Sequence, residues 1–528
     1  MLEKKSLGSQ ISHTLKGWGV DVIFGIPGVH NQEMYRGIEE AGIRHVLARH
    51  EQGAGFMADG YARACGKPGV AYVITGPGLC NIMTPMGQAY SDSVPILVLS
   101  SCLDEISMRR GQLHQMLDQE RAADCVCDWS YQANSPEAAY GLINRAFLEF
   151  QMQRPRSKHI QIPISLLETK TLRPAKKTYD FIKDTEVVGP AIESLSTALS
   201  EAKKPLFVIG GGAVNAHRDL LKVLLACEGA CFETYAGRGV VPFDYPLNYG
   251  ASLARPSSKQ IMSQADCVVA IGTELAEVDL WRNELGHSCS LYRIDIDPEC
   301  LSDEHLSDVA IRQRADITMA KLSEMMPTSF SDWDASSVLN QKLVWRSEIE
   351  FDRPGIIEIA DALRDALPKD TMIFSDMTQF AYVAKEIWPM SLPGHWHHPS
   401  GFGTLGYALP AAIGGATARP NQPTMAIAGD YGFQYTLQEL GTAVELKLSL
   451  PIVLWDNGKL KEIEDSMESA QIAPNAVIAK NPDFVKLAIA YGANAVAPQN
   501  LQEMQRAVRD AFSFAGPTLI YVTPSILL

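Results

Sequence analysis

The sequence predicts an α/β protein made of three consecutive, doubly wound parallel-sheet domains. Short apolar stretches typical of buried strands alternate with amphipathic helical stretches along most of the 528 residues, and this alternation is typical of parallel sheets covered by helices on both faces. Two polar stretches, 166–190 and 327–337, interrupt the alternation and resemble linkers in composition. We therefore expect domains at 1–168, 188–328 and 352–528.

The first unit follows this pattern from its start. The strand VDVIF ends at a Gly-Ile-Pro-Gly turn, and a helical stretch runs from about Asn31 to Glu40. The short strand HVLA precedes a helix from Glu51 to Ala64. The strand GVAYVIT is followed by a helix that ends near Tyr90 and then by the strand PILVLSS. These strands are rich in β-branched residues and bounded by Gly and Pro, which supports the assignment.

The other two units repeat the alternation. The strands KPLFVI, DCVVAIG and LYRIDID belong to the second unit, and TMIFS, MAIA and PIVLW to the third. Between MAIA and PIVLW, Thr436 and Glu439 have the T-x-x-E spacing of a capping box. We expect them to start a helix that runs to about Leu446.

Composition excludes several classes of partner and location. The net charge is -15 without a long Lys/Arg run, which disfavours nucleic acid and anionic membrane surfaces. No apolar run reaches the roughly 18 residues of a membrane span, and the start has no apolar signal-peptide core. The ten cysteines are scattered without metal or redox spacing. We expect a cytoplasmic protein with reduced thiols.

Oxygen-bearing side chains follow two strands of the third unit. Asp430 ends the strand MAIAG, and Asp456 and Asn457 end PIVLW. Open α/β sheets bind ligands at this carboxyl edge, and carboxylate, amide and phosphate oxygens suit Mg²⁺. Taken singly, Asp430 is more simply explained as a helix-capping residue, and Asp456-Asn457-Gly458 as a DNG turn.

Together the two halves resemble the signature of thiamine diphosphate enzymes, Gly-Asp-Gly followed by Asn-Asn, here Gly429-Asp430-Tyr431 and Asp456-Asn457. The resemblance implies that Asp430, Asn457 and the backbone carbonyl of Lys459 bind Mg²⁺. It also implies diphosphate contacts along Gly429, Asp430, Tyr431 and Gly432. Two departures stand out: Tyr431 replaces a small residue, and Asp456 replaces the first Asn.

Two further motifs support this resemblance. In RHEQGAGFMADGYAR, Glu51 matches the glutamate that hydrogen-bonds N1′ of the aminopyrimidine and favours its imino tautomer, although a helix N-terminal acid alone would also explain it. In HPSGFGTLGYALPAAIGGA, Leu405 matches the apolar prop that bends the cofactor, and Gly403 offers its carbonyl. The resemblance places further cofactor contacts at Pro27, Asn81, Asp376, Thr378 and Gln379.

Over its whole length the chain resembles the acetolactate synthase and 2-oxo acid decarboxylase family. That family orders a pyrimidine-binding, a middle Rossmann-like and a diphosphate-binding domain, and Glu51 of one subunit would face Asp430 of another. The resemblance therefore implies thiamine diphosphate and Mg²⁺ as cofactors, and a homodimer or homotetramer with active sites between subunits. Gly210-Gly211-Gly212 does not match a dinucleotide fingerprint, so FAD is not expected.

Segments 24–38 and 111–122 resemble 5-guanidino-2-oxopentanoate decarboxylases. His114 in the second segment is a candidate proton donor or carboxylate binder, and a surface histidine is an equally good explanation. The catalytic Glu that some relatives place six positions after the metal Asn is replaced by Ile463. The nearby acids Glu462, Glu464 and Asp465 either pair with a guanidinium or form a solvated helix face.

These observations predict non-oxidative decarboxylation of a 2-oxo acid substrate through an enamine intermediate, with a 5-guanidino-2-oxopentanoate-like substrate as the first candidate. An acetolactate synthase-like carboligase is the second hypothesis. The third is a non-catalytic homologue that only binds cofactor, which the departures at Tyr431, Asp456 and Ile463 would favour.

Overall fold

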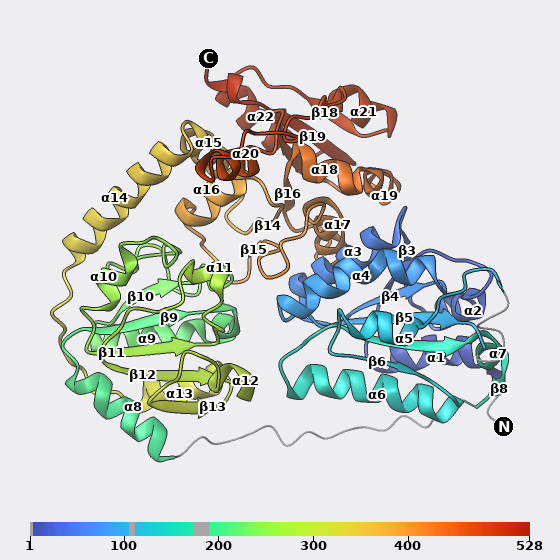
Figure 1. Cartoon of the computed structure of the whole chain (residues 1–528), viewed down its shortest axis with the longest axis horizontal. Helices are drawn as coiled ribbons and strands as arrows, with labels where there is room; N and C mark the ends of the chain where they lie inside the picture. The colour runs from blue at the N-terminus through green and yellow to red at the C-terminus, as the bar shows by residue number, and fades with distance from the viewer. Residues whose placement is uncertain (1–3, 105–110, 173–188) are drawn as a thin grey trace.

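The computed structural model describes residues 4–104, 111–172 and 189–528. Among these residues it contains three parallel sheets of six, five and six strands in consecutive parts of the chain. They lie at the corners of a triangle, with the first sheet at the right, the middle one at the left and the last at the top of Figure 1. The predicted α/β fold with three parallel sheets is confirmed.

The first sheet has the strand order β3-β2-β4-β5-β7-β6, and a two-stranded antiparallel sheet, β1-β8, lies beside it. The strands are β1 (Lys5–Ser6), β2 (Val22–Gly25), β3 (Arg44–Leu47), β4 (Gly69–Val73), β5 (Ile96–Cys102), β6 (Trp129–Gln132), β7 (Lys158–Pro163) and β8 (Lys170–Thr171). The helices are α1 (Leu7–Gly17), α2 (Gln32–Glu40), α3 (Glu51–Cys65), α4 (Pro77–Ser91), α5 (Gln119–Asp124), α6 (Pro136–Met152) and α7 (Ile164–Glu168).

The middle sheet has the order β10-β9-β11-β12-β13. Its strands are β9 (Pro205–Ile209), β10 (Ala230–Glu233), β11 (Cys267–Ile271), β12 (Ser290–Asp295) and β13 (Val309–Arg312). Its helices are α8 (Pro190–Glu201), α9 (His217–Cys227), α10 (Ser258–Met262), α11 (Glu277–Leu280), α12 (Pro298–Leu301) and α13 (Ala315–Met325). One apolar core surrounds this sheet.

The last sheet has the order β15-β14-β16-β17-β19-β18. Its strands are β14 (Met372–Ser375), β15 (Trp396–His397), β16 (Thr424–Gly429), β17 (Leu450–Trp455), β18 (Asn494–Val496) and β19 (Pro517–Val522). The helices are α14 (Ala335–Asp352), α15 (Ile356–Ala366), α16 (Gln379–Ile387), α17 (Ala408–Ala418), α18 (Asp430–Thr436), α19 (Leu440–Glu445), α20 (Lys461–Ser469), α21 (Phe484–Ala490) and α22 (Leu501–Ala511).

Three local expectations differ from the structure. The stretch expected to begin a linker at residue 166 still belongs to α7 and then to β8, which pairs with β1. Helix α14 was not expected, and its Trp345 is buried in the middle-domain core. The capping box is not formed, because Thr436 donates its hydroxyl to the carbonyl of Gly406 and Glu439 accepts from the N–H of Arg49. The helix expected after Thr436 is present and ends with α19 at Glu445, whereas α18 before it was not expected.

The first and last domains share one apolar core, which contains residues of α3, α4 and α17. Helices α3 and α17 cross closely at two glycines. A Cβ added to Gly60 would overlap the carbonyl of Ala411, and one added to Gly414 would overlap the carbonyl of Met57. Small residues are therefore required where the two domains meet.

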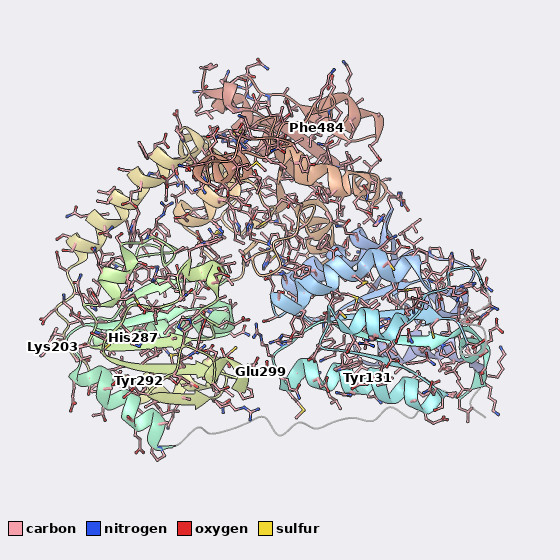
Figure 2. All side chains as sticks on the ribbon, viewed as in Figure 1. Tyr131, Lys203, His287, Tyr292, Glu299 and Phe484 are labelled. Atoms are coloured by element: carbon pink, nitrogen blue, oxygen red, sulfur yellow. The ribbon has the colours of Figure 1, made fainter. Side chains whose placement is uncertain are left out.

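Charged residues join the first and middle domains. Arg154 and Arg156 lie near Asp297, at 3.4 and 3.7 Å, and Arg156 lies 3.9 Å from Glu299. Figure 2 shows Glu299 on the side of the middle domain that faces the first domain.

All ten cysteines lie in the described ranges and are free thiols. No helix of the described residues is long and apolar enough to cross a membrane.

Candidate active site

The residues predicted to bind Mg²⁺ and the diphosphate lie close together, because β14, β16 and β17 are neighbouring parallel strands. Asp376 follows β14, Asp430 follows β16, and Asp456 and Asn457 follow β17. Gly429 pairs in register with Trp455, so Asp430 and Asp456 leave the sheet side by side. The structure thus brings the predicted metal-binding residues to one carboxyl edge.

Asp430 and Asp456 form a buried acidic pair, with 4% and 8% exposure. Asn481 donates to Oδ2 of Asp430 at 2.6 Å and to Oδ1 of Asp456 at 3.0 Å. Burial raises the pKa of Asp430, and the charge of Asp456 raises it further. Within the described ranges no Lys, Arg or His pairs with either carboxylate. Buried charges of one sign need a counter-ion, so this pair fits a bound cation.

The donor types at this edge fit Mg²⁺. The described residues contain no cluster of three or more His, Cys, Asp or Glu that could hold a metal. Mg²⁺ also takes amide, backbone carbonyl and phosphate oxygens beside a carboxylate. In the turn after β17, Oδ1 of Asn457 accepts from the backbone N–H of Lys459 at 3.3 Å. The Lys459 ammonium is held away by Glu464 at 2.8 Å.

Asp456 shapes this turn and is fully hydrogen-bonded. Its Oδ1 accepts from the N–H of Gly458 at 2.8 Å, and Gly458 adopts a φ of 72°. Its Oδ2 accepts from the Tyr521 hydroxyl at 2.8 Å. The departure from Asn at this position is therefore accommodated by a tyrosine and a glycine of the same domain.

The backbone is closely packed where the resemblance places the diphosphate. A Cβ added to Gly429 would lie 3.0 Å from Oγ1 of Thr378, and one added to Gly432 would lie 3.0 Å from the Asp376 carboxylate. Tyr431 packs near Tyr435, one turn further along α18, with ring centroids 6.0 Å apart. Its side chain therefore has room beside the helix, which accounts for the second departure.

Asp376 links two loops of this edge. Its carboxylate accepts from the N–H of Gly406 at 3.0 Å and of Met377 at 2.9 Å, and burial raises its pKa to about 6. Through these bonds it holds the segment that contains Gly403, with a φ of 68°, and the half-buried Leu405.

The pyrimidine-side residues gather at the carboxyl edge of the first sheet. Glu51 is the first residue of α3 and is 9% exposed. The Asn81 side chain of α4 donates to Oε2 of Glu51 at 2.9 Å. Oε1 lies 3.4 Å from where a Cβ on Gly78 would be, so any larger residue at this position would contact the carboxylate. Pro27 lies in the turn after β2, which Asn31 fixes by accepting from the N–H of Gly28 at 2.7 Å.

Two histidines lie at the same edge. The rings of His30 and His114 are 4.9 Å apart and nearly perpendicular, and in the described part of the chain their buried Nδ1 atoms have no hydrogen-bond partner. Burial and the neighbouring His114 lower the pKa of His30. The His114 backbone, with a φ of 64°, packs against Gly76 at the start of α4, which connects this pair to Asn81.

Within one chain the two halves touch close to some of the predicted residues: the backbone N–H of His50, next to Glu51, donates to Oε1 of Glu439 at 2.9 Å. Gly401 and Thr404 hydrogen-bond to Asp92 and Gln88 at 2.8 and 3.1 Å, at the end of α4 opposite to Asn81. Among the described residues no hydrogen bond or ion pair joins Glu51 to the metal-side residues. The half-sites are therefore separate in this respect.

The acidic side chains of α20 are compensated by protein cations. Glu462 pairs with Arg353 and accepts from the Gln379 side chain at 2.9 Å. Glu464 pairs with Lys459 and Lys461, and Asp465 with Lys461. The solvated or paired helix face is thus favoured over a guanidinium site at α20.

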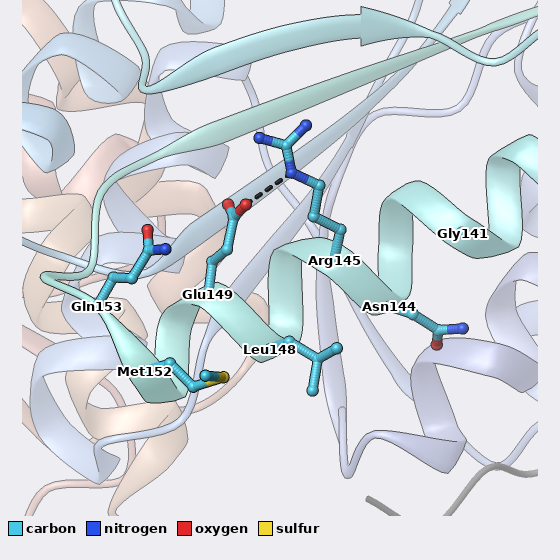
Figure 3. Close-up of a pocket in the computed structure, with 7 residues that line it drawn as sticks. All are labelled: Gly141, Asn144, Arg145, Leu148, Glu149, Met152 and Gln153. Atoms are coloured by element: carbon cyan, nitrogen blue, oxygen red, sulfur yellow. Dashed lines mark hydrogen bonds and ion pairs between the residues drawn. The ribbon is translucent and has the colours of Figure 1, made fainter.

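An open pocket of about 320 Å³ on α6 contains none of the predicted residues. Figure 3 shows Arg145 and Glu149 paired beside it, and their distance is 2.6 Å.

Sequence analysis missed Asn481 and Tyr521, which hold the acidic pair. Neither lies in a recognisable motif, because each contacts a residue far away in the chain: Asn481 and Asp430 are 51 positions apart, and Tyr521 and Asp456 are 65 apart.

Three family models match the chain. Residues 5–122 match the N-terminal TPP binding domain of thiamine pyrophosphate enzymes, 192–322 the central domain and 376–522 the C-terminal TPP binding domain. The probable 2-ketoarginine decarboxylase AruI of Pseudomonas aeruginosa is 41% identical, over 97% of this chain and 93% of that protein. The acetolactate synthase isozyme 2 large subunit of Escherichia coli is 28% identical, over 97% and 94%. The acetolactate synthase large subunit of Lactococcus lactis is 28% identical, over 94% and 89%.

Proposed function

The chain belongs to the thiamine pyrophosphate enzyme family, and from this premise we propose that it decarboxylates a 2-oxo acid with thiamine diphosphate and Mg²⁺. We further propose 5-guanidino-2-oxopentanoate, which is 2-ketoarginine, as the substrate. The observation that carries the proposal is the pair of half-sites: the buried Asp430–Asp456 pair, which no cation among the described residues neutralises, and the buried Glu51, whose Oε2 accepts from Asn81. The 41% identical relative, a probable 2-ketoarginine decarboxylase, supports the substrate.

The residues present fit both groups. Asp430, Asn457 and the Lys459 carbonyl would hold Mg²⁺, while Gly429, Tyr431, Gly432, Thr378 and Gln379 would surround the diphosphate. Asp376 would act mainly by fixing the loop that carries Gly403 and Leu405, which with Pro27 and Asn81 would surround the rings. When bound, thiamine diphosphate supplies an acceptor for the electrons released when the carboxylate leaves.

The chain's own groups would manage protons. Glu51, oriented by Asn81 at 2.9 Å, would hold a proton between its carboxylate and N1′ of the aminopyrimidine. His114 would donate the proton that releases an aldehyde, because its Nδ1 is buried without a protein partner in the described part of the chain. The His30 ring at 4.9 Å would orient it.

A carboligase is the second candidate, supported by the acetolactate synthase relatives at 28% identity. The two functions differ in what reacts after CO₂ has left the first substrate: a proton in the decarboxylase, or a second 2-oxo acid in the carboligase. The histidine pair favours protonation. A non-catalytic role is less favoured, since Tyr431 packs beside Tyr435 and Asp456 accepts from the N–H of Gly458 within its own turn.

We also propose that the enzyme is a homodimer or homotetramer with active sites between subunits. The separation of Glu51 from the metal-side residues in the described contacts supports this arrangement. A cytoplasmic location is proposed with it, supported by ten free thiols.

The test is CO₂ release from a panel of pyruvate, 2-oxoisovalerate, benzoylformate and 5-guanidino-2-oxopentanoate, with thiamine diphosphate and Mg²⁺ present or omitted. We expect cofactor-dependent release and an aldehyde product from the guanidino acid. An acetohydroxy acid product would instead establish the carboligase. No release from any acid by cofactor-loaded protein would contradict the decarboxylase.

A further inference from the structure

An open pocket of about 400 Å³ lies beside the histidine pair, at the carboxyl edge of the first sheet. His30 forms one wall, and Asp104 and Gln112 supply its other polar groups. Leu103, Leu113 and Ile164 supply apolar surface. The pocket is thus apolar along part of its wall and carries one carboxylate, and it adjoins the proposed proton donor.

Asp104 is positioned by two neighbouring strands. It follows the end of β5, which pairs with β7 in register at Cys102 and Pro163. Just after β7, Ser165 donates its hydroxyl to Oδ1 of Asp104 at 2.6 Å. No Lys, Arg or His of the described ranges forms an ion pair with Asp104, so its charge is available to a ligand.

The other carboxylates of the proposed site and its surroundings have partners. Those of α20 pair with Arg353, Lys459 and Lys461, Glu51 accepts from Asn81, and Asp430 belongs to the metal edge. In the segment that follows His114, Asp118 and Glu120 accept from the backbone N–H groups of Arg121 and Gln132 and line neither this pocket nor the one on α6. Among these described candidates Asp104 alone combines a pocket with an uncompensated charge.

We propose that Asp104 binds the guanidinium of the substrate and so determines specificity for a basic 2-oxo acid. This inference rests on the proposed function. The three methylenes of the substrate would lie along Leu103, Leu113 and Ile164, with the 2-oxo acid end towards His114. A guanidinium presents paired N–H donors that match a carboxylate, and Ser165 holds the carboxylate in place.

The test compares two substrates that differ mainly in charge, 5-guanidino-2-oxopentanoate and 5-ureido-2-oxopentanoate. Wild type is expected to prefer the guanidino acid. In Asp104→Asn, kcat/KM for the guanidino acid should fall about 10- to 100-fold, the range for losing a charged hydrogen bond, mainly through KM. The ureido acid should change less than about twofold, which also shows that the variant is folded. Asp244→Asn, an exposed residue of the middle domain, makes the same charge change and should alter neither substrate.

Binding gives a second readout that does not need turnover. In calorimetry, 4-guanidinobutanoate should bind wild type and Asp244→Asn alike and Asp104→Asn about 10-fold or more weakly. Asp104→Glu should recover part of the affinity. If wild type decarboxylates the guanidino acid but Asp104→Asn keeps the full preference, this inference is overturned while the proposed function stands. If wild type turns over neither acid, the proposed function itself fails.

Discussion

At the scale of single residues, the proton-holding role proposed for Glu51 can be tested directly. Replacing it with Gln keeps the shape and the hydrogen bond to Asn81 but removes the ionisable group. We expect Glu51→Gln to lower kcat by about 10²- to 10⁴-fold, the usual contribution of a positioned acid–base group. Steady-state CO₂ release would measure it, and calorimetry should show cofactor affinity within a few fold of wild type.

Glu137→Gln is the matched control, because Glu137 is exposed at the start of α6. It should leave kcat unchanged. Full activity of Glu51→Gln would disprove the assigned role and would leave Glu51 as a helix N-terminal acid.

The residue scale also shows how far the sequence predicts the site. Asp430, Asn457 and Glu51 were identifiable because each lies in a short motif next to a strand or helix end. Asn481 was not, because its contact with Asp430 spans 51 positions and its position depends on how the loop after α20 folds back. The pairing of Glu462 with Arg353 was equally hidden, since it joins two elements that are 109 positions apart.

At the scale of elements, the crossing of α3 and α17 limits residue size. Gly60→Ala would place a Cβ against the rigid backbone carbonyl of Ala411. Overpacking of this kind costs about 1–3 kcal/mol, so we expect a lower urea midpoint. Gly141→Ala is the control, since an added Cβ there meets nothing within 4 Å. In the helix α6 it should raise stability by about 0.5–1 kcal/mol. Equal effects of the two substitutions would contradict the close crossing.

Strands and helices with strong local patterns were predicted well, and elements that depend on tertiary contacts were not. The predicted stretches match β2, β3, β4, β5, β9, β11, β12, β14, β16 and β17, whereas β6, β7, β10, β13, β15, β18 and β19 were not predicted. The Thr436–Glu439 capping box failed because both side chains make contacts outside their own helix: Thr436 with Gly406, and Glu439 with the N–H groups of Arg49 and His50. Local spacing cannot reveal that a distant loop of the same domain, or a different domain, will bind the same polar atoms.

At the scale of the whole molecule, buried histidines should make the fold sensitive to acid. His159 is fully buried between the hydroxyls of Ser100 and Ser130, at 2.8 and 2.7 Å, and burial lowers its pKa from 6.5 to about 3. Because the fold holds His159 neutral, this side chain contributes fully to the free energy of unfolding above pH 6.5. The contribution is lost as pH falls, since the unfolded chain then binds a proton that the folded chain does not. Between pH 6.5 and 5 this loss is about 2 kcal/mol.

The comparison with His159→Asn isolates this effect. Buried carboxyls act in the opposite sense, since burial raises the pKa of Glu439 to about 7, but they are the same in both proteins. We expect the stability gap between wild type and His159→Asn, from urea unfolding, to narrow by about 2 kcal/mol from pH 7 to pH 5. A gap that is constant with pH would show that His159 does not stay neutral in the fold.

The proposed assembly, with each active site between two subunits, can be tested with hybrid dimers. If Glu51 of one subunit acts with Asp430 of the partner, a hybrid dimer of Glu51→Gln and Asp430→Ala chains contains one site with both changes and one with neither. Random reassociation of equal amounts makes half of the dimers hybrid, and each hybrid has one intact site of two. Mixing two inactive proteins should therefore restore about one quarter of wild-type activity.

Reassociation of Glu51→Gln with Glu51→Ala is the matched control, because neither chain can supply the glutamate and no activity should return. Size-exclusion chromatography before and after mixing would show that subunits exchange. If exchange occurs and the Glu51→Gln and Asp430→Ala mixture stays inactive, both half-sites must come from one chain. Recovery near one quarter would instead explain why one chain carries two complementary edges, since each needs the other edge from a second copy to complete a site.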